Sequence, residues 1–387
     1  MEIITSILII LGTGLVLGQA FETYRLAGIA GEILGGLILG PAVIGIIRPS
    51  SVLSSIADIS LFFIVLLIGI DVTTRVLTKS YTRSIPLSFS SFLLPSLVMT
   101  LILVLIFHLP LNMSVIAAIA TGVPSISIIS VLLRDYKVLQ KPAGQAILSS
   151  VVISDLLAFA FLSSLSGGDL VLRVTAILAF ILVLFYVDFL LTRNSERIIG
   201  LFSKLHAAEH GEKIIFGIVI LGGLLASTFF QAIGFTFVLG AFFSGMLISE
   251  LVVGKEVLGV LTRTLGRIND SFFIPVYFTI AGIDAVIPPL KYIIVMIALL
   301  AVTAVGSPLL TYRLSKALKM DMKPKSTAGF LGGRGAVGVV IAATALSLSL
   351  INENLYSMIL FATVIQAIVL PLLIEKDIEG TDTTPAA

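Results

Sequence analysis

Residues 112–133 read NMSVIAAIATGVPSISIISVLL, an apolar stretch that is interrupted near its middle. The interruption is the segment TGVPS at 121–125, which contains Gly122 and Pro124. Proline lacks the N–H group that an α-helix requires, and glycine weakens a helix, so the stretch predicts a helix that unwinds at this point. Within a bilayer, an unwound backbone is tolerated only where protein covers it or where it lines a cavity.

A second interruption, GGRG at 332–335, lies in the apolar range 326–349 and places Gly333 and Gly335 on either side of Arg334. Paired broken helices at equivalent places in two halves of a chain indicate the binding site of a transporter. We therefore expect the two broken helices to cross and to form such a site. The alternative is that proline and glycine merely kink two transmembrane helices.

The composition indicates a membrane protein, because 58% of the 387 residues are hydrophobic and only 12% are charged. A soluble domain carries about 25% charged residues. The apolar runs are continuous over about 18–25 residues and do not alternate, which favours transmembrane helices over a β-barrel. The chain has no cysteine, so disulfides and thiolate metal sites are excluded.

Charge, proline and glycine divide the chain into thirteen expected spans, and we predict an all-α polytopic fold. They lie near 3–20, 26–47, 51–70, 84–107, 112–133, 142–165, 170–192, 212–230, 232–249, 256–282, 289–314, 326–349 and 354–374. Thirteen spans fit two inverted six-helix repeats joined by the seventh as a linker helix. The remainder, 376–387, is expected to be a short cytoplasmic tail after one transmembrane unit, 1–375.

The distribution of lysine and arginine predicts the orientation. With the N-terminus outside, twenty of the 24 basic residues lie on the inner side. Arg48, Arg173 and Lys291 lie outside, and Arg334 lies within a span. The positive-inside rule therefore predicts a multi-pass protein of the cell membrane with a cytoplasmic C-terminus.

Asp155 lies near the centre of the sixth expected span, in LSSVVISDLLAF at 148–159, with no basic residue in that span. An ionisable group at this depth costs at least ~2.5–3.5 kcal/mol, so it predicts a functional site. Burial favours the protonated carboxyl group, whereas a partly dehydrated cation favours the carboxylate. One side chain can thus hold a proton or a metal ion in turn, which couples two fluxes. The alternative is a packing aspartate that is hydrogen-bonded to Ser154 or Thr121.

A hard cation requires more oxygen ligands than one carboxylate supplies. We expect the others from the hydroxyl groups of Thr121, Ser125 and Ser154 and from carbonyls freed at the first break. Arg334 is the one basic residue in a core span, and we expect its fork to bind carbonyls that a break releases. The alternative is that Arg334 pairs with an empty Asp155. Glu32, in the second span, lines the ion path or seals a helix contact.

Four segments resemble the monovalent cation:proton antiporter superfamily, on its second branch of bacterial and archaeal Na⁺/H⁺ antiporters and related membrane domains. They are GIAGEILGGLILGPAVIG at 28–45, GAFFSGMLISE at 240–250, FFIPVYF at 272–278 and GRGAVG at 333–338. The resemblance covers nearly the whole chain. It implies the sodium/proton antiporter fold, a homodimer and exchange by an elevator motion, with Asp155 as the ion- and proton-binding residue.

The resemblance also divides the chain by role. Residues 3–70 and 212–282 would form the dimerisation part, residues 84–165 and 289–374 the transport core, and residues 170–192 the linker helix. Na⁺, Li⁺ or K⁺ and H⁺ would be transported, with the lipid bilayer as surroundings. No cofactor, nucleic-acid partner or enzymatic activity is expected.

The sequence departs from the electrogenic members of that family at three places. Their paired aspartates become Ser154-Asp155, their lysine falls on Ser307, and a glutamate after Arg-Gly becomes Ala336. Loss of one acid and its basic partner keeps the charge balanced, so electroneutral 1:1 exchange is expected. The rivals are a gated K⁺ efflux pathway and a Na⁺-coupled symporter of an organic anion.

Overall fold

The computed structural model describes residues 3–24, 26–71, 81–125, 141–165, 193–206, 210–232, 236–248 and 253–369, with residues 129, 133, 136–138, 175, 182, 186 and 190. Over these residues the chain forms helices and no strand; one isolated bridge joins two loop positions. The predicted all-α fold is therefore confirmed. The predicted linker helix is outside the described residues except for isolated positions, and the predicted tail lies wholly outside them.

The helices of the first half, in chain order, share high apolar content. They are α1 (Ile3–Thr23), α2 (Gly28–Leu39), α3 (Ser51–Asp71), α5 (Tyr81–Ser88), η1 (Phe89–Leu93), α6 (Leu94–Leu105), α7 (Leu111–Gly122) and α9 (Pro142–Leu165). The expected span 26–47 is shorter than predicted, because α2 ends just before Gly40 and Pro41. Proline cannot continue a helix and disfavours helical geometry in the preceding residue, so this end follows from the sequence.

The later helices begin with α11 (Ser195–His206), a short helix in the charged segment between two apolar runs. The rest are α12 (Gly211–Ala232), α13 (Phe237–Leu247), α15 (Lys255–Ile268), η2 (Asn269–Phe273), α16 (Ile274–Ile283), α17 (Leu290–Ala301), η3 (Val302–Gly306), α18 (Ser307–Ala317), α19 (Pro324–Gly332), α20 (Ala336–Ser347) and α21 (Glu353–Val369).

The chain divides into two compact units, which are residues 1–17, 32–76 and 159–284, and residues 18–31, 77–158 and 285–387. In the first unit, α3 packs against α13 and α16, and α12 packs against α13. Val65 and Leu66 of α3 are fully buried there. The first unit is thus built around α3. The roles predicted for the two parts of the chain stay predictions.

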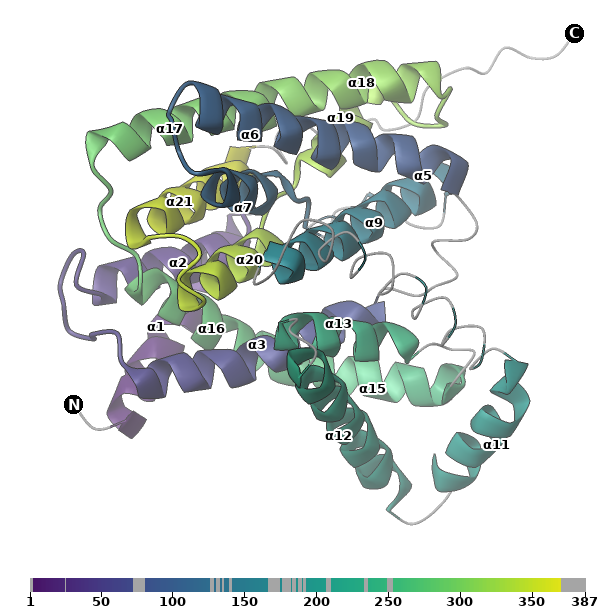
Figure 1. The fold of residues 1–387 in the computed structure, drawn as a ribbon. Coiled ribbons are helices and arrows are strands. Elements are labelled where there is room, and N and C mark those ends of the chain that lie inside the picture. Colours follow the sequence, from purple (N-terminus) through teal and green to yellow (C-terminus); the bar gives the residue numbers. More distant parts are fainter. Residues whose placement is uncertain are drawn as a thin grey trace, which may run out of the picture. The chain divides into compact units, whose positions relative to one another are not determined.

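In the second unit, α7 packs against α6, α20 and α21, and α18 packs against α19. The segments α5–η1–α6 and α17–η3–α18 lie side by side, and Figure 1 shows them as the dark blue and green ribbons along one edge of this unit. Both interrupted stretches of the sequence, at 121–125 and 332–335, belong to this unit.

Three π-helical turns, η1, η2 and η3, interrupt long helices, and each ends two residues before a proline. The prolines are Pro95, Pro275 and Pro308. A proline ring clashes with the carbonyl four residues earlier and offers it no N–H group, so the helix widens by one turn before the proline. The π-helical turns thus have a cause that is readable in the sequence.

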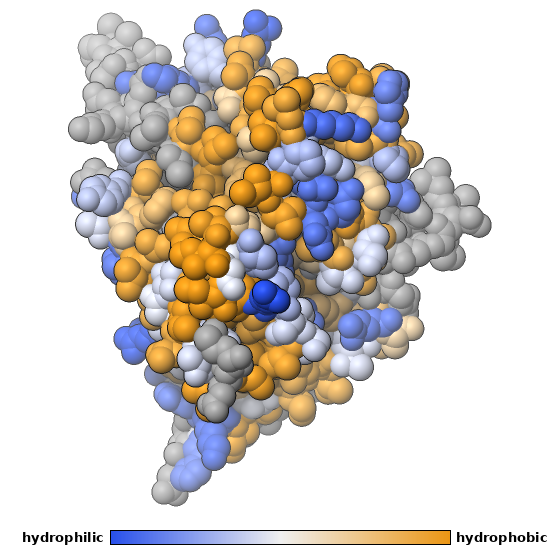
Figure 2. Space-filling view, turned by 90° about the vertical axis from the view of Figure 1, so that its left-hand side faces the viewer, coloured by the Kyte–Doolittle hydropathy of each residue, from blue (hydrophilic) through white to orange (hydrophobic). Residues whose placement is uncertain are grey.

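Six helices in the described part are long and apolar enough to cross a membrane, and four shorter apolar helices accompany them. Broad apolar areas are exposed on the face shown in Figure 2. Exposed large side chains include Leu8, Leu221, Phe229 and Ile297. An exposed apolar surface of this kind is expected where lipid is the solvent. The number of thirteen spans stays a prediction.

Candidate functional site

The two broken helices are joined at their breaks. Helix α7 ends at Gly122 and α19 ends at Gly332, and between the ends Pro124 and Arg334 form an antiparallel bridge. The backbone N–H of Ser125 donates to the carbonyl of Gly333 at 2.8 Å. Each break thus supplies partners for backbone groups that the other leaves unpaired, as burial in a bilayer requires.

The broken helices also touch where α20 passes α7. At Gly338 of α20, an added Cβ atom would overlap the carbonyl oxygen of Ala120 in α7. The absence of a side chain at Gly338 therefore allows backbone to meet backbone at the crossing. The predicted pair of crossing broken helices is confirmed in this unit.

Asp155 lies on α9, which begins at Pro142, a residue whose fixed φ suits the first helical position. Its side chain is 0% exposed, and neither carboxyl oxygen has a hydrogen-bond partner in the described part of the chain. A buried unpaired carboxylate costs several kcal/mol. A proton or a bound cation would remove that cost, so this carboxyl group is fit to hold either.

The serines of the same helix are satisfied locally. Ser149 and Ser154 donate to the carbonyls of Gln145 and Ser150, at 2.8 Å and 2.9 Å. The Ser154 hydroxyl also lies 2.9 Å from that of Ser88, in α5. Because its hydrogen goes to Ser150, Ser154 accepts the bond from Ser88. Asp155 is therefore not a packing residue held by the Ser154 hydroxyl.

Thr121 and Ser125 flank the first break, and both are buried. The Thr121 hydroxyl donates to the carbonyl of Ala117 at 2.7 Å, within its own helix, which leaves its lone pairs as acceptors. It does not bond to Asp155, whose oxygens have no partner among the described residues. Ligation by Thr121, Ser125 and Ser154 stays a prediction.

Arg334 is 1% exposed and binds three groups around the second break. Its Nη1 donates to the carbonyl of Leu331 at 3.2 Å, and its Nη2 donates to the carbonyl of Ser91 at 2.9 Å. Nη2 also lies 3.3 Å from the Ser307 hydroxyl, which itself donates to the Ser91 carbonyl at 3.0 Å. The guanidinium group thus links η1, α18 and the end of α19.

Three residues of this network were not predicted, namely Ser88, Ser91 and Pro95. The signal in the sequence was Pro95 inside an expected span, since a proline frees the carbonyl four residues earlier. Glu32, which was predicted to line the ion path or to seal a helix contact, is buried in α2, within the first unit.

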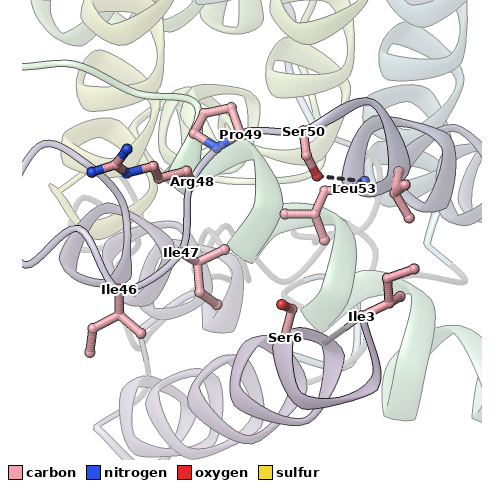
Figure 3. Close-up of a pocket in the computed structure, with 9 residues that line it drawn as sticks. Ile3, Ser6, Ile46, Ile47, Arg48, Pro49, Ser50 and Leu53 are labelled. Carbon is pink, nitrogen blue, oxygen red and sulfur yellow. Dashed lines mark hydrogen bonds between the residues drawn. The ribbon is translucent and has the colours of Figure 1, made fainter. Parts of the chain in front are cut away.

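The described part of the first unit has one shallow hollow of about 340 Å³ beside the start of α3. Figure 3 shows Ile3, Ser6, Ile47 and Leu53 among its lining residues, with the Arg48 guanidinium turned away from them. None of the predicted site residues lines this hollow. It is therefore separate from the site around the broken helices.

Comparison with known proteins identifies the relatives. The chain is 26% identical over 379 residues to a protein of Methanocaldococcus jannaschii named "Probable Na(+)/H(+) antiporter 3", covering 95% of this chain and 94% of that one. It is 23% identical to the "Na(+)/H(+) antiporter" of Enterococcus hirae, covering 97% and 98%.

The solved structure of the sodium proton antiporter MjNhaP1 from M. jannaschii, at pH 8, superposes with a TM-score of 0.70 at 16% identity. The match covers 96% of this chain and 95% of that one, and it shows the same fold. The family model for the transmembrane sodium/hydrogen exchanger matches residues 7–376. The chain therefore belongs to the sodium/hydrogen exchanger family of membrane transporters and is not an enzyme.

Proposed function

We propose that the chain exchanges a monovalent cation, Na⁺ in the first place, for a proton, and that the two compete for Asp155. The observation that carries the proposal is a fully buried carboxyl group without a hydrogen-bond partner in the described residues, in the unit that holds both broken helices. The names of the two relatives, which describe Na⁺/H⁺ antiporters, support the choice of ions.

The mechanism follows from one charge with two possible partners. With a proton bound, the site is neutral, and with Na⁺ bound it is neutral again, so either loaded form avoids an unpaired charge in the membrane. The empty carboxylate is costly to move across the bilayer. Movement is therefore favoured only with a proton or a cation in place, which couples the two fluxes one to one.

We propose that the oxygens of Thr121, Ser125 and Ser154, with carbonyls at the first break, complete the cation shell. Exchange is electroneutral because a serine stands at 154 and another at 307. The protein works as a homodimer in the cell membrane, with its N-terminus outside and its C-terminus in the cytoplasm. The transport core moves as an elevator against the dimerisation part.

The test is cation-driven proton flux in vesicles that contain purified protein, with pulses of Na⁺, Li⁺ or K⁺. Wild type should release protons on addition of the transported cation, and Asp155→Asn should abolish the signal. Lower pH should raise the KM for the cation and leave kcat unchanged, because protons compete for the same carboxylate. An Asp155→Asn variant that exchanges as fast as wild type would refute the proposal.

The same vesicles separate the remaining candidates. K⁺ flux that needs no opposing proton would favour an efflux pathway, and uptake of an organic anion with Na⁺ would favour a symporter. Asp155→Glu is the matched control, because it keeps the charge and changes only the reach of the carboxylate. It should retain measurable exchange with an altered KM.

A further inference from the structure

The carbonyl of Ser91 lacks the donor that an α-helix would give it. In an α-helix, the carbonyl of residue 91 accepts from the N–H group of residue 95. Residue 95 is proline and has no N–H group. The helix widens into the π-helical turn η1 at this place, and the carbonyl is left available for other donors.

Two side chains from distant parts of the sequence donate to this carbonyl. Arg334 Nη2 donates at 2.9 Å and the Ser307 hydroxyl donates at 3.0 Å. Both side chains are buried. A proline in one helix thus creates the acceptor on which the buried guanidinium group is anchored.

The same helical stretch also holds the helix of Asp155. Ser88 bonds to Ser154, the neighbour of Asp155, and Ser88 lies three residues before Ser91, which is about 4.5 Å of helix rise. Arg334 is the only buried basic side chain among the described residues. Its guanidinium group nevertheless binds carbonyls, and the Asp155 oxygens accept no hydrogen bond in the described part of the chain.

We propose that Pro95 is a positioning residue for exchange. By freeing the Ser91 carbonyl, it gives Arg334 a fixed anchor and keeps the guanidinium group from binding Asp155 in place of the transported cation. A guanidinium group that is released from this anchor competes with the cation for the carboxylate, since opposite charges in a low-dielectric site attract strongly. The inference rests on the proposed role of Asp155.

The test is Pro95→Ala in the reconstituted vesicles. Alanine restores an N–H group that donates to the Ser91 carbonyl and so displaces Arg334. The KM for the cation should rise at least threefold while kcat stays within twofold, a split that a general loss of folded protein does not produce. Pro275→Ala is the matched control, because η2 also precedes that proline but no described side chain donates to the Ser271 carbonyl.

Two further variants keep the test decisive if Pro95→Ala folds poorly. Ser307→Ala removes one donor to the Ser91 carbonyl and one contact of Arg334, so it should raise the KM, whereas Ser307→Thr keeps the hydroxyl and should resemble wild type. In the double variant Pro95→Ala/Ser307→Ala, the increases in KM should fall short of their product, because both act on one anchor.

The inference is overturned if Pro95→Ala and Ser307→Ala leave the KM unchanged, or if Pro275→Ala raises it equally. Loss of exchange in Asp155→Asn together with an unchanged KM in Pro95→Ala removes this inference alone. Full exchange in Asp155→Asn removes the proposed function itself.

Discussion

The backbone N–H of Ser125 donates to the carbonyl of Gly333 at 2.8 Å, so the two interrupted helices are bonded to each other at their breaks. The contact joins backbone to backbone, and Pro124 and Arg334 form a bridge beside it. The shape of the crossing therefore depends on main-chain geometry and on close approach of the helices. Side chains near the crossing should be replaceable only where they leave this approach intact.

Gly338→Ala tests the close approach of α20 to α7. The added methyl group would overlap the carbonyl of Ala120, and overpacking of this kind costs about 1–3 kcal/mol. We expect a lower melting temperature in detergent and a loss of exchange. Gly217→Ala in α12 is the matched control, because no atom lies within 4 Å of its added methyl group. Equal melting temperatures for the two variants would contradict the packing argument.

Thr121→Val and Thr121→Ser together test a hydroxyl ligand at the first break. Valine has nearly the shape of threonine but no oxygen, so we expect a several-fold higher KM for the cation. Serine keeps the oxygen and should stay near wild type. Proton flux at graded cation concentrations measures the difference, and equal KM values would remove Thr121 from the cation shell.

Arg334→Lys tests the fork that binds two carbonyls. One ammonium group cannot reproduce the bonds from Nη1 to Leu331 and from Nη2 to Ser91. A buried carbonyl left without its donor costs about 1–3 kcal/mol, so the melting temperature should fall. Arg313→Lys, at an exposed position of the neighbouring α18, should leave it unchanged.

Exchange should be independent of the membrane potential. One cation moves for one proton in the proposed cycle, so no net charge crosses the bilayer. The measurement is Na⁺-driven proton flux in vesicles whose potential is set by K⁺ and valinomycin. A rate that follows the imposed potential, with net charge moved in each cycle, would show that a second charge takes part.

The sequence predicted the positions of both breaks, because proline and glycine act locally on the helix that contains them. Helix α7 ends within the interruption at 121–125, and α19 ends within the interruption at 332–335. Neither Gly333, with φ −57°, nor Gly335, with φ 175°, adopts the left-handed conformation. These glycines therefore do not act through a backbone geometry that only glycine allows.

Asp155 could be singled out from the sequence because an acid amid apolar residues needs a reason whatever surrounds it. The network around Arg334 could not be derived in the same way. The bond from Arg334 to the Ser91 carbonyl joins residues 243 positions apart, and periodicity within one helix carries no information on such a contact. Ser154 likewise has a hydroxyl partner, Ser88, that is 66 positions away.

The π-helical turn before Pro95 has a consequence for the register of its helix. A π-helical turn accommodates one residue more than an α-helical turn, so the segment that follows is rotated by about 100° relative to an uninterrupted helix. Deletion of a single residue within 89–93 would therefore turn a different side of α6 toward α7. The turn sets the angular phase of the second half of the helix, and insertions or deletions there act at a distance from the site itself.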